Sequence, residues 1–84
     1  MADYRPVLYH SHLSPECVRV RRALRSLGVE VDTRSVLLSR RNRDALRRIG
    51  GEVRVPCLVV SGTVVVEVDE IIKYLHLRYG DPGG

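Results

Sequence analysis

Ser14 and Cys17 carry the side chains best suited to chemistry, because they lie three residues apart at the start of a predicted helix. Ser14 can cap that helix, Pro15 needs no N–H donor at its first position, and Glu16 favours the positive end of the helix dipole. A hydroxyl, a thiol and unpaired backbone N–H groups are therefore expected at one place. Such a place can bind an anion, a thiolate in particular. A plainly capped helix with a buried cysteine has the same spacing.

The remaining cysteine and the histidines give weaker signals. Cys57 is the second of only two cysteines, and we expect both to be reduced, small core side chains. His10 and His12 lie in the loop that leads to Ser14, where we interpret them as polar loop residues. No further ligands stand at a spacing typical of a metal centre, so no metal is predicted.

Arginine accounts for 13 of the 14 basic residues, and the formal net charge is +4. Residues 1–54 hold 12 basic residues against 6 acidic ones, which could attract nucleic acid or a small anion. Interleaved aromatic residues and a recognisable nucleic-acid-binding module are both missing, so we expect a solvated arginine-rich surface and no nucleic-acid partner. Without a long apolar run or a signal peptide, we expect a cytoplasmic protein that binds no membrane.

The elements that position Ser14 and Cys17 follow from the spacing of apolar residues and from turn signals. The predicted strands are residues 6–9, 29–33, 55–60 and 63–66, and the predicted helices are residues 15–27, 39–49 and 67–79. In the second helix, Ala45, Leu46 and Ile49 are expected on the buried side. The order β-α-β-α-β-β-α predicts an α/β fold in which a parallel pair and a hairpin form a four-stranded mixed sheet. We expect one domain over residues 1–84, with an ordered core of about residues 5–80.

This order resembles the thioredoxin fold, because Ser14-Pro15-Glu16-Cys17 follows the first strand and Val55-Pro56 precedes the third. The chain is most similar to glutaredoxins and to the N-terminal domain of glutathione transferases, over nearly all of residues 5–80. Leu8-Tyr9 before Ser14, and the ending Glu67-x-Asp69-x-Ile71-Ile72-x-Tyr74-Leu75, look like serine-type transferases of the delta and theta kind. Gly51-x-x-x-Val55-Pro56 looks more like a glutaredoxin.

The resemblance implies glutathione as the ligand and assigns residues around the third strand. Pro56 would be cis and would expose the backbone of Val55 to the cysteinyl part of glutathione. Arg54, or Arg40 as the other candidate, would bind the glycyl carboxylate.

The start of the last helix receives the γ-glutamyl end of glutathione by the same resemblance. Glu67 and Asp69 match positions that hold the γ-glutamyl ammonium, and N–H groups at this helix start would bind its carboxylate. Val68 stands where transferases usually carry serine or threonine, so one hydroxyl contact is missing.

Ser14 decides which chemistry the resemblance implies. In serine-type transferases the matching hydroxyl donates to the glutathione sulfur, whereas in glutaredoxins the matching residue is the nucleophilic cysteine. A serine cannot form the mixed disulfide that thiol exchange requires. If the domain is an enzyme, the resemblance therefore favours activation of the glutathione thiol.

Two alternatives to glutathione binding and thiol activation stay open. One is an interaction module that kept the fold and lost glutathione, and the other is a redox protein that uses Cys17. Transferases carry an all-helical second domain, so the chain is expected to be either a piece of a larger protein or a stand-alone module. A homodimer is the other partner that we expect.

Overall fold

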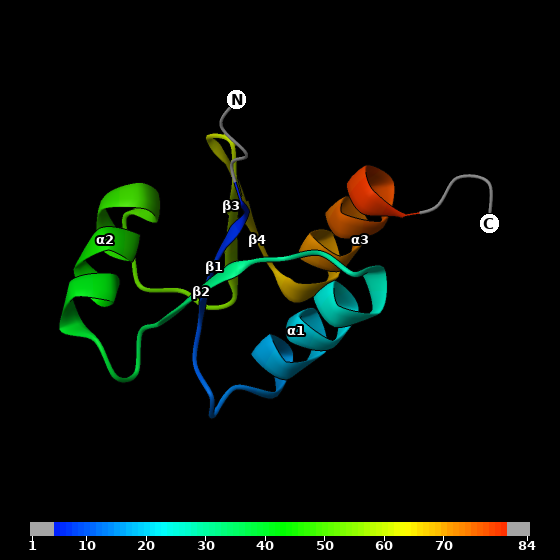
Figure 1. Ribbon diagram of the computed structural model, residues 1–84. Coiled ribbons are helices and arrows are strands. Elements are labelled where there is room, and N and C mark those ends of the chain that lie inside the picture. The colour runs from blue at the N-terminus through cyan, green and yellow to red at the C-terminus, as the bar shows by residue number, and fades with distance from the viewer. Residues whose placement is uncertain (1–4, 81–84) are drawn as a thin grey trace.

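A computed structural model describes residues 5–80 as a four-stranded sheet with helices on both faces (Figure 1). The strands are β1 (Val7–His10), β2 (Asp32–Ser35), β3 (Cys57–Val60) and β4 (Thr63–Val66), and the helices are α1 (Pro15–Leu27), α2 (Arg40–Gly50) and α3 (Val68–Tyr79). Helices α1 and α3 lie together on one face of the sheet, and α2 lies on the other. The predicted domain also includes residues 1–4 and 81–84, which lie outside the described residues.

The sheet has the strand order β2-β1-β3-β4. Strand β1 pairs in parallel with β2 and antiparallel with β3, and β3 pairs antiparallel with β4. The β3–β4 hairpin turns at Ser61 and Gly62, whose φ angles of 47° and 85° are typical of the tight turns that match strand twist. The α/β fold with a mixed four-stranded sheet, predicted from the sequence, is confirmed.

Side chains alternate between two apolar layers along the central strands. The larger layer, between the sheet and helices α1 and α3, buries Leu8, Val20, Leu24, Leu58, Val60, Ile71 and Leu75. The smaller layer, beneath α2, buries Tyr9, Val36, Leu46 and Cys57. Full burial of one such aliphatic side chain stabilises by about 1.5–3 kcal/mol, so the larger layer fixes α1 and α3 firmly against the sheet.

Three predicted details differ in the structure. Residues 29–31 precede the second strand: Val29 and Val31 pack against the larger layer, but the ladder begins where Asp32 pairs with Val7, because β1 offers only four residues for pairing. Ile49 is 40% exposed, since α2 packs on the smaller layer through Ala45 and Leu46. The third strand likewise begins at Cys57, after Val55 and Pro56.

Candidate functional site

Ser14 caps α1 as predicted and keeps a hydrogen-bond donor available. Its backbone is extended, and its Oγ accepts a hydrogen bond from the N–H of Cys17 at 3.3 Å. The N–H of Ser14 itself donates to the carbonyl of Ser11 at 3.2 Å, which fixes the loop before the helix. A hydroxyl that accepts one bond can still donate its own hydrogen. The Ser14 side chain is therefore oriented by the helix and remains able to donate to an acceptor beyond it.

Cys17 lies inside the helix start and is not on the surface. Its side chain is fully buried, and its Sγ accepts a hydrogen bond from the N–H of Ser11 at 3.4 Å. Cys57 is also free and buried, but it packs beneath α2 on the opposite face of the sheet. Burial raises the pKa of the Cys57 thiol, which favours its neutral form.

The segment before β3 contains a cis peptide bond between Val55 and Pro56. Pro56 is buried, and Val55 packs against the smaller apolar layer. Arg54, the residue before them, is exposed and forms an ion pair with Glu67 at the start of α3 and a longer one, at 3.8 Å, with Glu52. The structure therefore joins Arg54 to Glu67, two residues that the sequence assigned to opposite charges of the ligand.

Glu67 has an unusual backbone at the start of α3. Its φ of 73° and ψ of 124° fall where residues other than glycine rarely lie, and its side chain makes no capping hydrogen bond. Such conformations cost about 1–3 kcal/mol and cluster at ligand sites. Two residues on, the carboxylate of Asp69 pairs with Arg19 of α1 at 3.4 Å. Val68, between them, packs against the larger apolar layer.

Ion pairs hold three of the predicted site residues, Arg54, Glu67 and Asp69, which we call the connected group, and Arg40 lies apart from it. Ion pairs link Arg54 to Glu67 and Asp69 to α1, the helix that Ser14 caps. Arg40 lies at the start of α2 and takes no part in these pairs. Of the two candidates for the glycyl carboxylate, the structure brings only Arg54 to the start of α3.

His10 was wrongly interpreted as a polar loop residue, because it is the last residue of β1 and only 3% exposed. Its Nδ1 is buried without a hydrogen-bond partner, and its ring meets that of His12 edge-on at 4.8 Å. Burial, His12 and the positive charge of Arg21, in that order, lower its pKa. The signal that could have found it is the two-residue period of the strand, which puts position 10 on the face of Leu8.

Residues 5–80 hold neither a metal-binding cluster nor a membrane-spanning helix. Within residues 5–80, no three histidine, cysteine or acidic side chains converge closely enough to hold a metal ion. Over the same residues, none of the helices is long and apolar enough to cross a membrane.

Comparison with known proteins gives a consistent family. A sequence model for the glutathione S-transferase N-terminal domain matches residues 8–83. A probable maleylacetoacetate isomerase from Caenorhabditis elegans is 37% identical over 82 residues, which cover 96% of this chain and 38% of that protein. The chain thus spans little more than a third of the length of this relative.

Solved structures share the fold over most of the chain. Glutathione S-transferase 1-6 from Anopheles dirus species B superposes with a TM-score of 0.78 at 29% identity, covering 89% of this chain and 36% of its own. A delta-class transferase from Nilaparvata lugens gives 0.79 at 26% identity, with 90% and 37% covered. A Drosophila mojavensis transferase homologue with bound glutathione gives 0.82 at 23% identity, with 94% and 37% covered, a likeness of fold alone. The chain belongs to the family of glutathione S-transferase N-terminal domains and has the thioredoxin-like fold that its sequence predicted.

Proposed function

We propose that this domain binds glutathione between the start of α1, the Val55–Pro56 segment and the start of α3, and that Ser14 activates its thiol. The geometry of Ser14 carries the proposal, because its Oγ is held by the N–H of Cys17 while its hydrogen stays free to donate. Family membership supports it, as does the bound glutathione in the Drosophila mojavensis homologue.

Thiol activation rests on two contributions of different size. The dipole of α1 favours a thiolate at its N-terminus by about 0.3–1 kcal/mol at a partly exposed site. A hydrogen bond to a charged acceptor contributes about 1.5–3 kcal/mol. The Ser14 hydroxyl is therefore the main group that lowers the pKa of the bound thiol, with the dipole second.

The rest of glutathione is assigned to the connected group and to neighbouring backbone groups. The N–H groups at the start of α3 bind the γ-glutamyl carboxylate, Glu67 and Asp69 bind the ammonium, and the backbone of Val55 pairs with the cysteinyl unit. Val68 contributes only its backbone N–H.

Arg54 has to change partner in this proposal. It now pairs with Glu67, and it would exchange that carboxylate for the glycyl carboxylate as Glu67 binds the ammonium. Both side chains of the pair are more than half exposed, and such pairs contribute about 0–1 kcal/mol. The exchange therefore opposes glutathione binding only weakly.

Ser14→Ala tests the proposed role of the hydroxyl. Loss of the donor should raise the pKa of the bound glutathione thiol, followed by the ultraviolet absorbance of the thiolate during a pH titration. Ser39→Ala is the matched control, since Ser39 caps α2 in the same way by accepting from the N–H of Asn42 at 3.2 Å. Each variant loses a cap worth about 0.5–2 kcal/mol, but only Ser14→Ala should alter the thiol. Equal thiol pKa values in the two variants would contradict the role of Ser14.

Two other functions compete with this one. An interaction module without glutathione is favoured by the Arg54–Glu67 pair, which joins two of the groups that the ligand needs. A redox role for Cys17 is disfavoured by its complete burial, because a nucleophilic thiolate must be reached by its substrate. If the domain takes part in catalysis, we infer that glutathione supplies the reacting sulfur. The helical second domain, a homodimer and a cytoplasmic location stay predictions.

A further inference from the structure

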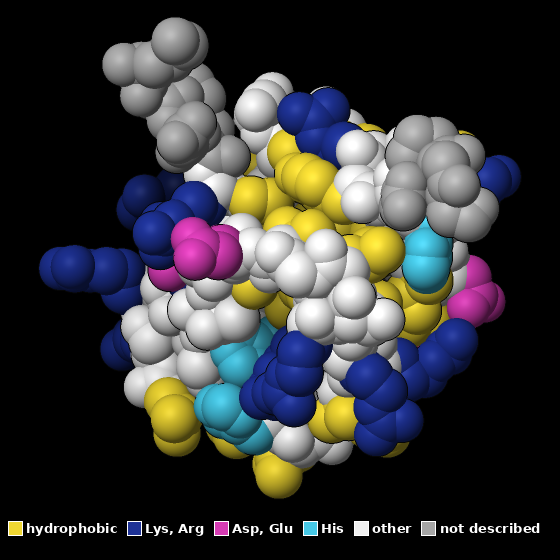
Figure 2. Space-filling view, turned by 45° about the vertical axis from the view of Figure 1, so that its right-hand side comes forward, with side chains coloured by type: hydrophobic (Ala, Val, Ile, Leu, Met, Phe, Trp, Pro, Cys, Tyr) yellow, Lys and Arg dark blue, Asp and Glu magenta, His cyan; other side chains and the backbone are white. Residues whose placement is uncertain are grey.

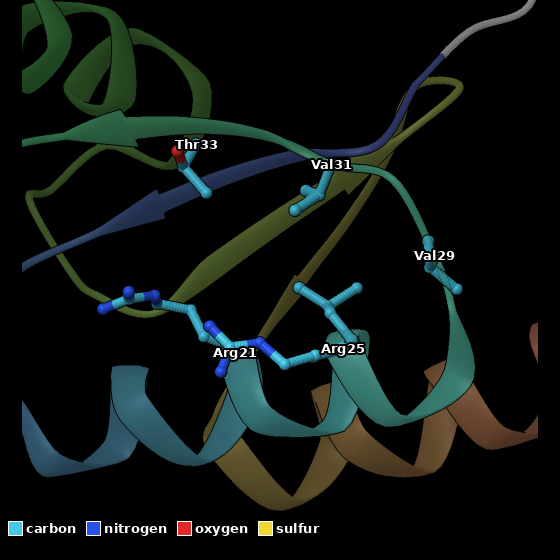
Figure 3. Close-up of a pocket in the computed structure, with 6 residues that line it drawn as sticks. Arg21, Arg25, Val29, Val31 and Thr33 are labelled. Atoms are coloured by element: carbon cyan, nitrogen blue, oxygen red, sulfur yellow. The ribbon is translucent and has the colours of Figure 1, made fainter.

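A hollow of about 350 Å³ lies between α1 and the segment that enters β2, away from the residues assigned to glutathione. Its lining residues are Arg21, Leu24 and Arg25 of α1, together with Val29, Val31 and Thr33 (Figure 3). Leu24 is 2% exposed, and Val29 and Val31 pack against the same apolar layer, so the inner wall is apolar and fixed by the fold. The floor of the hollow is therefore part of the packed core.

Two cations stand at its rim. Arg21 and Arg25 are four residues apart and thus on one side of α1, and Figure 3 shows both side chains extending along the hollow. Within residues 5–80, neither forms an ion pair, although the neighbouring Arg19 does. The positive charge of Arg21 also helps to lower the pKa of buried His10.

The surface around the hollow has the same mixed character. Figure 2 shows basic side chains bordering exposed apolar surface on the side of the molecule where α1 and α3 lie. A second hollow shares Val29 and continues this surface towards Leu27 and Tyr79. An anionic head beside an apolar body would match both parts of such a surface.

We propose that this hollow is a second binding site, which takes a small amphiphilic anion: a carboxylate on a short alkyl chain or a single ring. The guanidinium groups of Arg21 and Arg25 bind the carboxylate, because their planar donors match its two oxygens. The apolar part of the ligand lies against Leu24, Val29 and Val31. The volume is near the lower end for ligand sites, which matches a small ligand.

Octanoate is the probe, and octanol is its uncharged counterpart. In an NMR titration of the whole chain, octanoate should give saturable shifts at Val29, Val31 and Thr33, and octanol should bind at least tenfold more weakly. The double variant Arg21→Gln/Arg25→Gln should lose at least tenfold in octanoate affinity. Arg22→Gln is the matched control, because Arg22 carries the same charge on the same helix but does not line this hollow, and it should keep the affinity of the parent.

Three results would each overturn the second site. They are octanol binding as tight as that of octanoate, unchanged affinity in the double variant, and no saturable shift below the micellar concentration of octanoate. The amide spectrum of each variant shows whether it is folded. This site is independent of the proposed function, because the double variant should bind glutathione as the parent does.

Discussion

At the scale of single residues, the side chains that matter most are held in place by backbone geometry. Ser14 is oriented because it caps α1, and Glu67 lies in an unusual backbone conformation at the start of α3. His10 is buried because it continues the strand that leads to Ser14. The cap formed by Ser14, the φ angle of Glu67 and the burial of His10 can therefore each be tested by substitution.

His10 makes stability depend on pH. Its pKa in the folded chain lies below the ordinary value of 6.5, so the unfolded chain takes up a proton first as the pH falls. The free energy of unfolding should therefore be highest above pH 6.5 and decrease as the pH falls through 6.5 towards the folded pKa. His10→Asn should flatten this decrease in urea unfolding between pH 7.5 and 5, whereas the exposed His76→Asn should not. An unchanged slope in His10→Asn would show that another group is responsible.

Glu67 should tolerate substitution by glycine better than Glu70 does. Glycine adopts a φ of 73° without the cost of about 1–3 kcal/mol that a side chain incurs. Glu70 lies in the first turn of α3, where glycine costs about 1 kcal/mol. In urea unfolding, Glu67→Gly should therefore be neutral or stabilising and Glu70→Gly destabilising. A Glu67→Gly variant that loses as much stability as Glu70→Gly would show that the backbone of Glu67 is not strained.

At the scale of elements, the helix ends show most clearly what sequence can predict. Ser14-Pro15 and Gly28 mark both ends of α1, because capping and a left-handed glycine are local requirements. The start of β2 could not be read in this way, since it depends on which residues of β1 remain to pair with. The alternation of apolar and polar residues over 29–33 indicated correctly that Val29 and Val31 pack against the core. It gave no information on where the pairing of β1 with β2 begins.

Gly80 is required at the end of α3 for a steric reason. A Cβ at this position would lie 2.3 Å from the carbonyl oxygen of His76, to which the N–H of Gly80 donates at 2.9 Å. Gly80→Ala should therefore lower the free energy of unfolding by about 1–3 kcal/mol, as overpacking does. Gly50→Ala, at the end of α2, meets no atom within 4 Å and should raise it by about 0.5–1 kcal/mol. Urea unfolding of both variants checks the prediction, and equal effects would contradict it.

At the scale of the whole molecule, the sheet brings together helix starts that are far apart in the sequence. The order of elements and the motifs at the strand ends made the thioredoxin-like fold predictable, because resemblance fixes how the elements are arranged. The pairing of Arg54 with Glu67 was not predictable, because the partner of a long exposed side chain depends on how the loops are arranged in the folded chain. The hollow beside Arg21 could not be predicted either. Its walls come from α1 and from the segment that enters β2, and these meet only in the folded chain.

The sheet separates the two thiols, and the length of α1 separates the two sites. Cys17 packs on the side of α1 and α3, and Cys57 lies beneath α2. The residues assigned to glutathione lie at the starts of α1 and α3, whereas the second hollow lies along the later turns of α1. We therefore expect ligands of the two sites to bind without competition.

Glutathione titration followed by amide chemical shifts tests the central proposal most directly. With millimolar glutathione, the shifts of Ser14, Val55 and residues 67–69 should change first and saturate together. Ser39, which caps α2 outside the connected group, should serve as an internal reference and stay unperturbed. Saturable shifts at these residues would support glutathione binding at the starts of α1 and α3. No saturable change at any of them, in a chain whose spectrum is that of a folded domain, would contradict it.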